Sequence, residues 1–311
     1  MKYLHLFGPV PSRRLGVSLG IDLIPQKTCP YDCIYCECGR TTNRTCERRE
    51  YVPTADVIRE LDDYLRRRPQ LDYITFAGSG EPTLHSGIGA IIGHLKEHYP
   101  GYRAAVLTNG ALFADPEVRR DLASADLVVP SLDAVSESVF AALNRPCPGL
   151  TADAVLDGLI AFSREFSGEI WLEIFIVPGL NDTDEELARL RDAIRAIDPD
   201  RVQVNTLDRP GTEIWVTPAS AAALERIAEY LGDKRVEVIG PCTCREASPT
   251  FRADILDAIT ATLARRPCTT EDLCKIFSLH RNEINKYLEV LLEKGDIEAV
   301  SEERGLFFRL K

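Results

Sequence analysis

An α/β fold is predicted for this 311-residue chain: a partial (β/α)6 barrel of the TIM type, followed by a C-terminal winged helix-turn-helix. Short β-rich runs alternate with amphipathic helical stretches from residue 16 to about 240, which indicates parallel strands covered by helices. Polar or glycine-rich motifs follow nearly every run. After residue 248 the alternation stops, and a pattern of helices followed by a strand pair begins.

Six strands and six helices are expected to alternate in the barrel. The strands are residues 16–24, 73–80, 103–110, 127–134, 169–179 and 201–208, and the helices are 54–68, 86–98, 116–124, 151–166, 183–197 and 217–231. A seventh short strand, 236–240, is expected to extend the sheet. Because the carboxyl ends of parallel strands share one face, the motifs that follow the strands are expected on one rim.

The segment 251–311 is predicted to be a winged-helix domain, with residues 1–240 as the barrel and 241–250 as the linker. Helices are expected over 251–265, 269–278 and 281–295, followed by a strand pair. Residues 248–311 hold ten Lys and Arg against eleven Asp and Glu, a net charge of −1. Phosphate neutralisation dominates nucleic-acid affinity, so a substrate-presenting or partner-docking role is favoured over DNA binding.

Composition narrows the class of protein. The net charge of −11 argues against a protein that coats nucleic acid. No apolar run is long enough for a membrane span, and the N-terminus lacks the features of a secretory signal. A cytoplasmic location is expected, where thiols are reduced and clustered cysteines serve metal binding or catalysis.

The motif CPYDCIYC places Cys29, Cys33 and Cys36 in a C-x3-C-x2-C spacing directly after the first predicted strand. Three thiolates on one loop can hold three corners of a four-iron cluster and leave the fourth iron open. Random placement of the cysteines would give only about 0.01 such triplets, so the spacing is informative. The alternative is a structural zinc loop with Cys38 as the fourth ligand.

This motif, with Tyr35 before its third cysteine, resembles the signature of the radical SAM superfamily. Residues 8–42, 143–146, 178–182 and 208–211 resemble its wyosine-synthase-like Fe–S oxidoreductases. The resemblance implies that S-adenosylmethionine binds the open iron of a [4Fe–4S] cluster and is cleaved reductively to methionine. The other product is a 5′-deoxyadenosyl radical that abstracts a hydrogen atom from a substrate. A flavodoxin or ferredoxin is expected as the electron donor.

Motifs at four further strand ends are expected to seat the cofactor. GSGE resembles the family motif for the methionyl amine, with Ser79 in place of one glycine, and the carboxylate of Glu81 can receive an ammonium group. An ordinary glycine turn and simple helix capping are the alternatives for these motifs. The residues expected to bind the cofactor are Gly78, Gly80, Glu81, Asn109, Ser131, Asp133, Gly179 and Asn181.

Four other cysteines lie near the same rim if the seventh strand extends the sheet: Cys38, Cys46, Cys242 and Cys244. They are predicted to form a second metal site, holding either an auxiliary Fe–S cluster or zinc, with unpaired buried thiols as the alternative. The remaining cysteines near or beyond the barrel, Cys147, Cys268 and Cys274, are expected to be core or surface thiols.

The function predicted is that of a radical SAM enzyme acting on an unidentified substrate, with tRNA modification as one possibility. Two alternatives stay open: a radical enzyme that modifies a peptide or protein, and a transcription regulator that senses through an Fe–S or zinc site. Basic residues near the cysteine loop suggest an anionic substrate, although solvated charges are the alternative. They are Arg13, Arg14, Lys27, Arg40 and Arg44, with Asn205 and Arg209 expected on the same rim.

Overall fold

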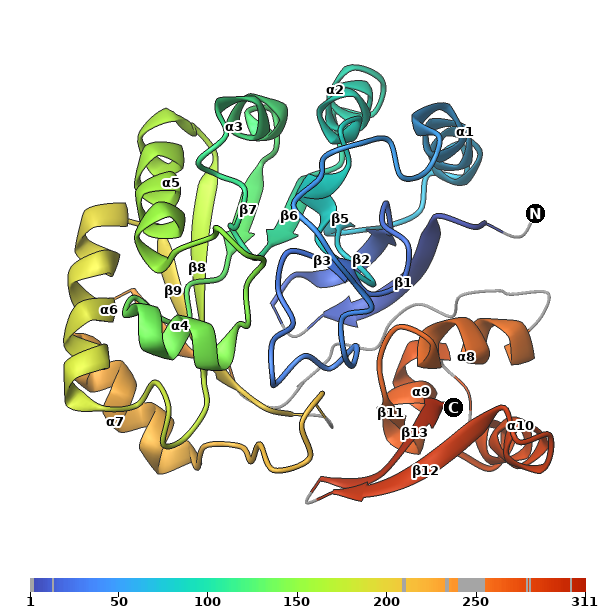
Figure 1. The fold of residues 1–311 in the computed structure, drawn as a ribbon. Coiled ribbons are helices and arrows are strands. Elements are labelled where there is room, and N and C mark those ends of the chain that lie inside the picture. Colours follow the sequence, from blue (N-terminus) through green and yellow to red (C-terminus); the bar gives the residue numbers. More distant parts are fainter. Residues whose placement is uncertain are drawn as a thin grey trace.

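The protein is described here by a computed structural model that covers residues 3–12, 14–208, 211–232, 235–239, 255–277, 279, 281–302 and 304–311. Its main feature is an eight-stranded sheet in the order β1-β2-β5-β6-β7-β8-β9-β10. All neighbours from β2 to β10 pair in parallel, and only β1 is antiparallel. The sheet curves as an open barrel with helices on its outer side (Figure 1). The predicted α/β fold is therefore confirmed.

The strands agree with the sequence patterns. They are β2 (Gly16–Ile21), β5 (Tyr73–Phe76), β6 (Ala104–Thr108), β7 (Leu127–Pro130), β8 (Glu169–Ile176), β9 (Arg201–Thr206) and β10 (Val236–Val238). The outer helices are α1 (Thr54–Leu65), α2 (Ile88–His98), α3 (Pro116–Leu122), α5 (Ala152–Glu165), α6 (Asp184–Ile197) and α7 (Ala221–Leu231). Short apolar runs suffice to locate these strands because both faces of the sheet are covered.

Two elements of the barrel were not predicted. Strand β1 (Leu6–Ser12) reads LFGPVPS, and its prolines lack the N–H needed for a central strand. It occupies the edge beside β2, with an irregular register between Phe7 and Val10. Helix α4 (Glu137–Leu143) has only seven residues, too few for a clear apolar periodicity.

The lumen of the barrel is apolar at one end and polar at the other. An apolar plug fills its floor, formed by Leu15, Tyr73, Ala105, Leu127, Val129 and Trp171. Toward the carboxyl rim the residues that share this face become polar, including Thr75, Glu173 and Asn205. Since successive residues of a strand point to opposite faces, the strands bury apolar side chains under the helices and present these groups to the lumen.

The C-terminal segment packs against β1. It contains α8 (Ile255–Leu263), β11 (Cys268–Thr269), α9 (Thr270–Phe277), α10 (Arg281–Glu293), β12 (Ile297–Glu302) and β13 (Gly305–Leu310), with strand order β11-β13-β12. We call residues 255–311 the C-terminal module; it has its own apolar core, which Val10 of β1 also touches. The predicted linker, residues 241–250, lies outside the described residues. Among the described helices, none has the length and apolar character needed to cross a membrane.

Candidate active site

The cysteine loop is fixed on both sides by backbone contacts. Its first residues form β3 (Thr28–Cys29), which pairs in parallel with β4 (Asn43–Arg44). On the other side, the backbone N–H of Cys147 donates to the carbonyl of Pro30 at 2.8 Å. The loop therefore presents its three cysteines from a rigid frame at the carboxyl end of the barrel.

Each cysteine of the motif accepts a hydrogen bond from a different side chain. Sulfurs that bind iron do so as thiolates, and hydrogen bonds to such charged acceptors are stronger than neutral ones. Two of the donors come from loops far away in the sequence, one of them in the LNRP segment. The three bonds are Asn109 Nδ2 to Cys29 Sγ (3.3 Å), Asn144 Nδ2 to Cys33 Sγ (3.4 Å) and Lys27 Nζ to Cys36 Sγ (3.3 Å).

The electrostatics of the loop differ between its cysteines. Burial raises the pKa of Cys29 and raises that of Cys33 to about 12. The pKa of Cys36 is lowered to about 6, first by a hydrogen bond with Cys38 and then by the Lys27 ammonium. Burial alone would lower the pKa of Lys27, but the neighbouring thiolates raise it. Lys27 thus supplies a buried positive charge next to the third sulfur.

These residues fit an iron–sulfur cluster. Three sulfur ligands come from one loop, and each has its own N–H donor, which is the environment that tunes such clusters. Among the described residues, no group of three or more His, Cys, Asp or Glu side chains is placed to hold a metal ion. A four-iron cluster does not require side chains that converge on one ion, because each cysteine binds a separate iron.

Glu81 of the GSGE motif is fully engaged by the protein. One carboxylate oxygen accepts from Thr83 N (3.1 Å), Thr83 Oγ1 (2.6 Å) and Thr108 Oγ1 (2.6 Å). The other accepts from Asn109 N at 2.8 Å. Burial raises the pKa of this carboxyl, while the four bonds oppose the shift. Glu81 therefore ties the GSGE loop to the TNG loop, a role that sequence reasoning missed.

The glycines of this motif serve close packing. A Cβ atom on Gly80 would lie 2.1 Å from the carbonyl oxygen of Thr28, so a larger residue would push the cysteine loop away. Gly78 has a φ of +145° and packs against the carboxylate of Asp22. Ser79 donates to the same carboxylate at 2.8 Å. The small residues of GSGE are therefore explained by packing against Thr28 and Asp22 as well as by binding of a ligand.

Asp133, which follows β7, connects the end of that strand with the cysteine loop. It is buried, and it accepts hydrogen bonds from the Tyr35 hydroxyl, from Asn144 Nδ2 (3.1 Å) and from Phe175 N (2.8 Å). Burial raises its pKa to about 6. The Tyr35 ring stacks on Phe175 at 4.0 Å between centroids. Asp133 therefore orients Asn144, which is the hydrogen-bond donor to the second cysteine, Cys33.

The PGLND loop divides into a buried and an exposed part. Asn181 is buried, and its Oδ1 accepts from Val177 N at 2.8 Å. Its Nδ2 donates to the carbonyl oxygens of Asp133 (2.8 Å) and Phe175 (2.7 Å). Gly179 is exposed with a φ of +80°, and no atom lies within 4 Å of a Cβ built there. Asn181 holds the loop in place, while Gly179 leaves room at the rim.

A charged pair lies in the polar part of the lumen. Arg14 Nη1 approaches Glu173 Oε1 at 2.7 Å, and Asn205 Nδ2 donates to the same oxygen at 3.1 Å. Ser131 Oγ lies 3.5 Å from the other oxygen. Glu173 was not predicted as a site residue, although a carboxylate in the middle of the apolar run EIWLEIFI was a usable signal.

The comparisons with known proteins agree with this geometry. The family model of the radical SAM superfamily matches residues 23–191. The chain belongs to the radical SAM superfamily. Membership implies an enzyme of the radical SAM type, with a [4Fe–4S] cluster and S-adenosylmethionine. The wyosine-synthase-like branch stays a prediction.

Curated relatives cover most of this radical SAM chain. It is 33% identical to a UPF0026 protein of Methanocaldococcus jannaschii, covering 90% of this chain and 89% of that protein. It is 36% identical, over 96% of its length, to a Brachyspira hyodysenteriae protein named GTPase Obg. The chain spans 44% of that longer protein. It therefore also belongs with the UPF0026 proteins.

Solved radical SAM enzymes share the fold at low sequence identity. Streptococcus suis SuiB bound to precursor peptide SuiA has a TM-score of 0.55 and 17% identity, over 72% of this chain and 49% of that one. A radical SAM methyltransferase from Sphaerobacter thermophilus has a TM-score of 0.55 and 18% identity, over 72% and 66%. TYW1 with a lysine-pyruvate adduct has a TM-score of 0.50 and 14% identity, over 72% and 75%.

The cysteines predicted for a second metal site have different neighbours. Cys38 Sγ lies 3.0 Å from the carbonyl oxygen of Arg265 in the C-terminal module. Cys46 instead lies beside Cys147, and burial together with this neighbour raises its pKa to about 12. Cys242 and Cys244 lie outside the described residues. The second metal site stays a prediction. The contact between Cys46 and Cys147 was not part of that prediction.

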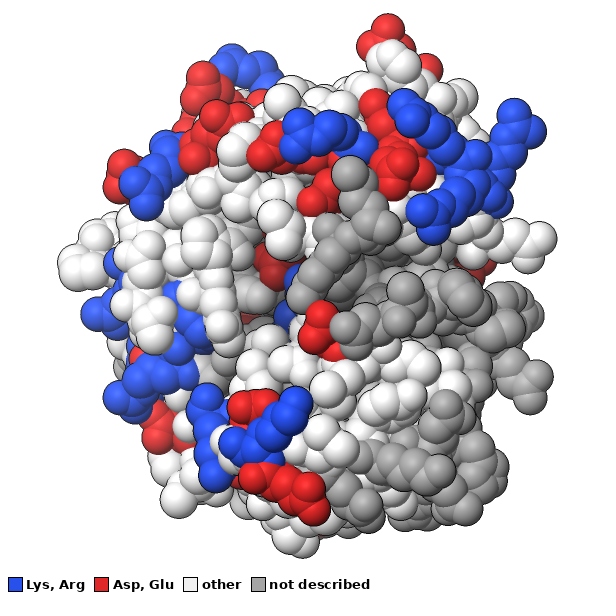
Figure 2. Space-filling model, turned by 90° about the vertical axis from the view of Figure 1, so that its right-hand side faces the viewer, with Lys and Arg blue, Asp and Glu red and all other residues white. Residues whose placement is uncertain are grey.

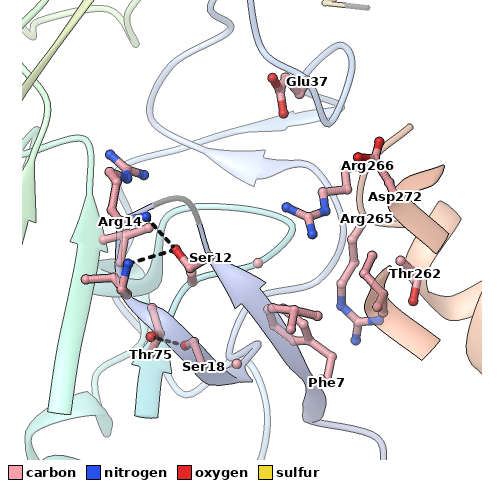
Figure 3. Close-up of a pocket in the computed structure, with 18 of the residues that line it drawn as sticks. Phe7, Ser12, Arg14, Ser18, Glu37, Thr75, Thr262, Arg265, Arg266 and Asp272 are labelled. Atoms are coloured by element: carbon pink, nitrogen blue, oxygen red, sulfur yellow. Dashed lines mark hydrogen bonds between the residues drawn. The ribbon is translucent and has the colours of Figure 1, made fainter. Parts of the chain in front are cut away.

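A cavity of about 280 Å³ lies next to the cofactor motifs of this radical SAM enzyme. Its wall includes Gly78 and Cys38 from the rim and Ser18 and Thr75 from the strands. The last two hydroxyls are hydrogen-bonded to each other (Figure 3). The rest of the wall comes from β1 and its neighbours and from the C-terminal module, so the cavity lies between the two parts of the chain.

Proposed function

We propose that this protein cleaves S-adenosylmethionine reductively and uses the 5′-deoxyadenosyl radical to abstract hydrogen from a substrate. The observation that supports this most is the cysteine loop, whose three thiols each accept a hydrogen bond from a separate donor. When bound, the cluster supplies the electron for the cleavage. A flavodoxin or ferredoxin in the cytoplasm is proposed as its source.

The chain's own residues hold and shield this chemistry. Cys29, Cys33 and Cys36 are the proposed cluster ligands, and the Lys27 ammonium offsets part of their negative charge. The backbone at Gly78 and the open space beside Gly179, together with Ser131, are proposed to receive the cofactor. The apolar plug at the barrel floor excludes water from below the reacting groups.

The basic residues near the loop give limited support to a tRNA substrate, because their charges are largely used within the protein. On the face in Figure 2, Lys and Arg side chains alternate with Asp and Glu instead of forming one basic patch. Arg13 and Arg209 lie outside the described residues. The internal contacts are Arg14 with Glu173, Lys27 with Cys36, Arg40 with Glu213 and Arg44 with the carbonyl of Arg145.

The two alternative functions have less support. The likeness to SuiB with its peptide shows a shared fold and leaves the substrate of this chain open. A regulator needs no cofactor rim, yet the rim motifs and the cysteine loop are joined by Glu81 and Asn109. We propose that the C-terminal module is a winged helix and that it contributes to the activity of the barrel.

Anaerobic reconstitution tests the proposal. Protein loaded with iron and sulfide is incubated with dithionite and S-adenosylmethionine, and 5′-deoxyadenosine is quantified. The wild type and a Cys274→Ser control are expected to form it, whereas Cys33→Ala is expected to lose both cluster and product. A cluster-loaded wild type that releases no 5′-deoxyadenosine would contradict the proposed function.

A further inference from the structure

The cavity beside the cofactor rim is built by both parts of the chain. From the barrel it is lined by residues of β1, β2, β5 and β6 and of the cysteine loop, and from the C-terminal module by residues of α8 and α9 and the turn between them. Gly78 and Cys38 form part of the same wall. A molecule bound here would therefore lie next to the motifs proposed to seat the cofactor.

The module is held against the barrel by polar contacts around this cavity. Arg265 lies 3.5 Å from the carboxylate of Asp22, and its guanidinium covers the ring of Phe7 at 4.6 Å. Gln26 Nε2 donates to the carbonyl of Ala264 at 3.0 Å. These contacts hold Ala264 and Arg265 in place, so the position of the adjacent Arg266 side chain is also defined.

Arg266 is the cation of the cavity wall that has no charge partner within the described part of the chain. The wall holds four cations, Arg14, Arg265, Arg266 and Lys275, against Glu37 and Asp272. Three of the cations have acidic neighbours. Arg14 lies 2.7 Å from Glu173, Arg265 lies 3.5 Å from Asp22, and Lys275 lies 3.1 Å from Glu271.

The two acids of the wall do not neutralise Arg266 in the structure. Asp272 binds Arg304, and Glu37 has an interaction of its own. The Arg266 side chain extends from the module toward the centre of the cavity, on the side of Ser12 and Arg14 (Figure 3). A planar guanidinium in this position is suited to a carboxylate or a phosphate.

The size of the cavity suits a small molecule. Its volume of about 280 Å³ is at the lower end of small-molecule sites, which begin at about 300 Å³. The hydroxyls of Ser18 and Thr75 and the backbone at Gly78 offer polar contacts on the barrel side. A folded RNA or a long peptide would need a larger and more open surface.

We propose that this cavity is the substrate pocket, that its ligand is a small molecule bearing a carboxylate or phosphate, and that Arg266 binds that anionic group. The inference rests on the proposed radical SAM function and names the substrate class. It also accounts for the presence of the C-terminal module, because the module supplies one wall of the pocket and its anion-binding residue.

The first test measures anion binding to the full-length, cluster-reconstituted protein with S-adenosylmethionine, without oxygen. Inorganic phosphate and malonate are titrated separately by calorimetry, which distinguishes the two anion types. At least one of them is expected to bind the wild type. Arg266→Gln is expected to weaken that binding about tenfold or more, whereas Arg266→Lys restores part of it. Arg195→Gln, at an exposed arginine of α6, is the matched control and should bind like the wild type.

The second test measures 5′-deoxyadenosine formation after addition of either an RNA-free and protein-free metabolite extract or purified tRNA. Stimulation by the extract that is lost in Arg266→Gln and kept in Arg195→Gln supports the pocket. Failure of both anions to bind, equal binding by Arg266→Gln, or stimulation by tRNA alone overturns the inference, although radical cleavage itself would stand. Absence of 5′-deoxyadenosine from every sample instead contradicts the proposed function.

Discussion

Replacing Glu81 by alanine is expected to destabilise the protein even without cluster or cofactor. Its carboxylate accepts two backbone N–H groups, from Thr83 and Asn109, and two hydroxyl groups, from Thr83 and Thr108. The hydroxyls can turn toward other acceptors, whereas the backbone groups are fixed. Each buried donor left without a partner costs about 1–3 kcal/mol. The two backbone groups together predict a loss of about 4 kcal/mol in the free energy of unfolding.

Urea unfolding of the cluster-free protein, followed by circular dichroism, measures this loss. The slope with denaturant should stay unchanged, so that the midpoint reports stability. Glu117→Ala is the control, because this carboxylate is 67% exposed and pairs only loosely with Arg48, so its loss should cost about 0.5 kcal/mol or less. A Glu81→Ala protein as stable as the control, but unable to bind S-adenosylmethionine, would refute the structural role and restore the ammonium-binding role that the resemblance implies.

Three further predictions concern packing, acid stability and the metal content. Gly158→Ala in α5 places a Cβ 2.6 Å from the backbone nitrogen of Ala114, between β6 and α3, and should cost about 1–3 kcal/mol in urea unfolding. Gly93→Ala in α2, with nothing within 4 Å, should instead stabilise by up to about 1 kcal/mol; similar values for both would contradict the packing argument. Burial lowers the pKa of His85 below 6.5, so the unfolded state binds more protons and stability falls as the pH drops below that value. The urea midpoint of His85→Gln should fall less than that of the wild type between about pH 7 and pH 5. An equal fall of the midpoint in both proteins would count against protonation of His85 as the cause. Cys46→Ser should keep the wild-type iron and sulfide content, because its neighbour is Cys147; a lower iron content would instead support the second metal site.

The barrel could be predicted because its signal is repeated. Each central strand is a short apolar run between turn residues, and parallel strands buried on both faces need such runs. Strand β1 could not be found in this way, since edge strands tolerate the prolines that usually exclude a strand. The cysteine loop was also predictable, because three ligands within eight residues leave a local pattern.

The hydrogen bonds between the loops could not be predicted, because they depend on conformation rather than on spacing. Glu81 was expected to face a ligand, yet its partners come from the following turn and from the next strand end. Asn144 lies in a segment that the resemblance singled out, but only the fold shows that it donates to Cys33 and Asp133. Sequence motifs thus locate the rim, and the structure decides which residues build it and which remain accessible.

The C-terminal module shows why the chain is better understood as one unit than as an enzyme with an attached reader domain. Arg265 is a half-buried cation whose pKa is lowered by burial, an effect that Asp22 opposes from across the interface. Its carbonyl oxygen lies 3.0 Å from the thiol of Cys38, two residues after the third cysteine of the cluster motif. Undocking the module would break the pair of Arg265 with Asp22 and uncover the Phe7 ring at the same time. The same two-residue segment, Arg265 and Arg266, therefore both anchors the module beside the cysteine loop and supplies the cation proposed to bind the anionic ligand. Docking of the module and completion of the proposed substrate pocket are consequently a single event.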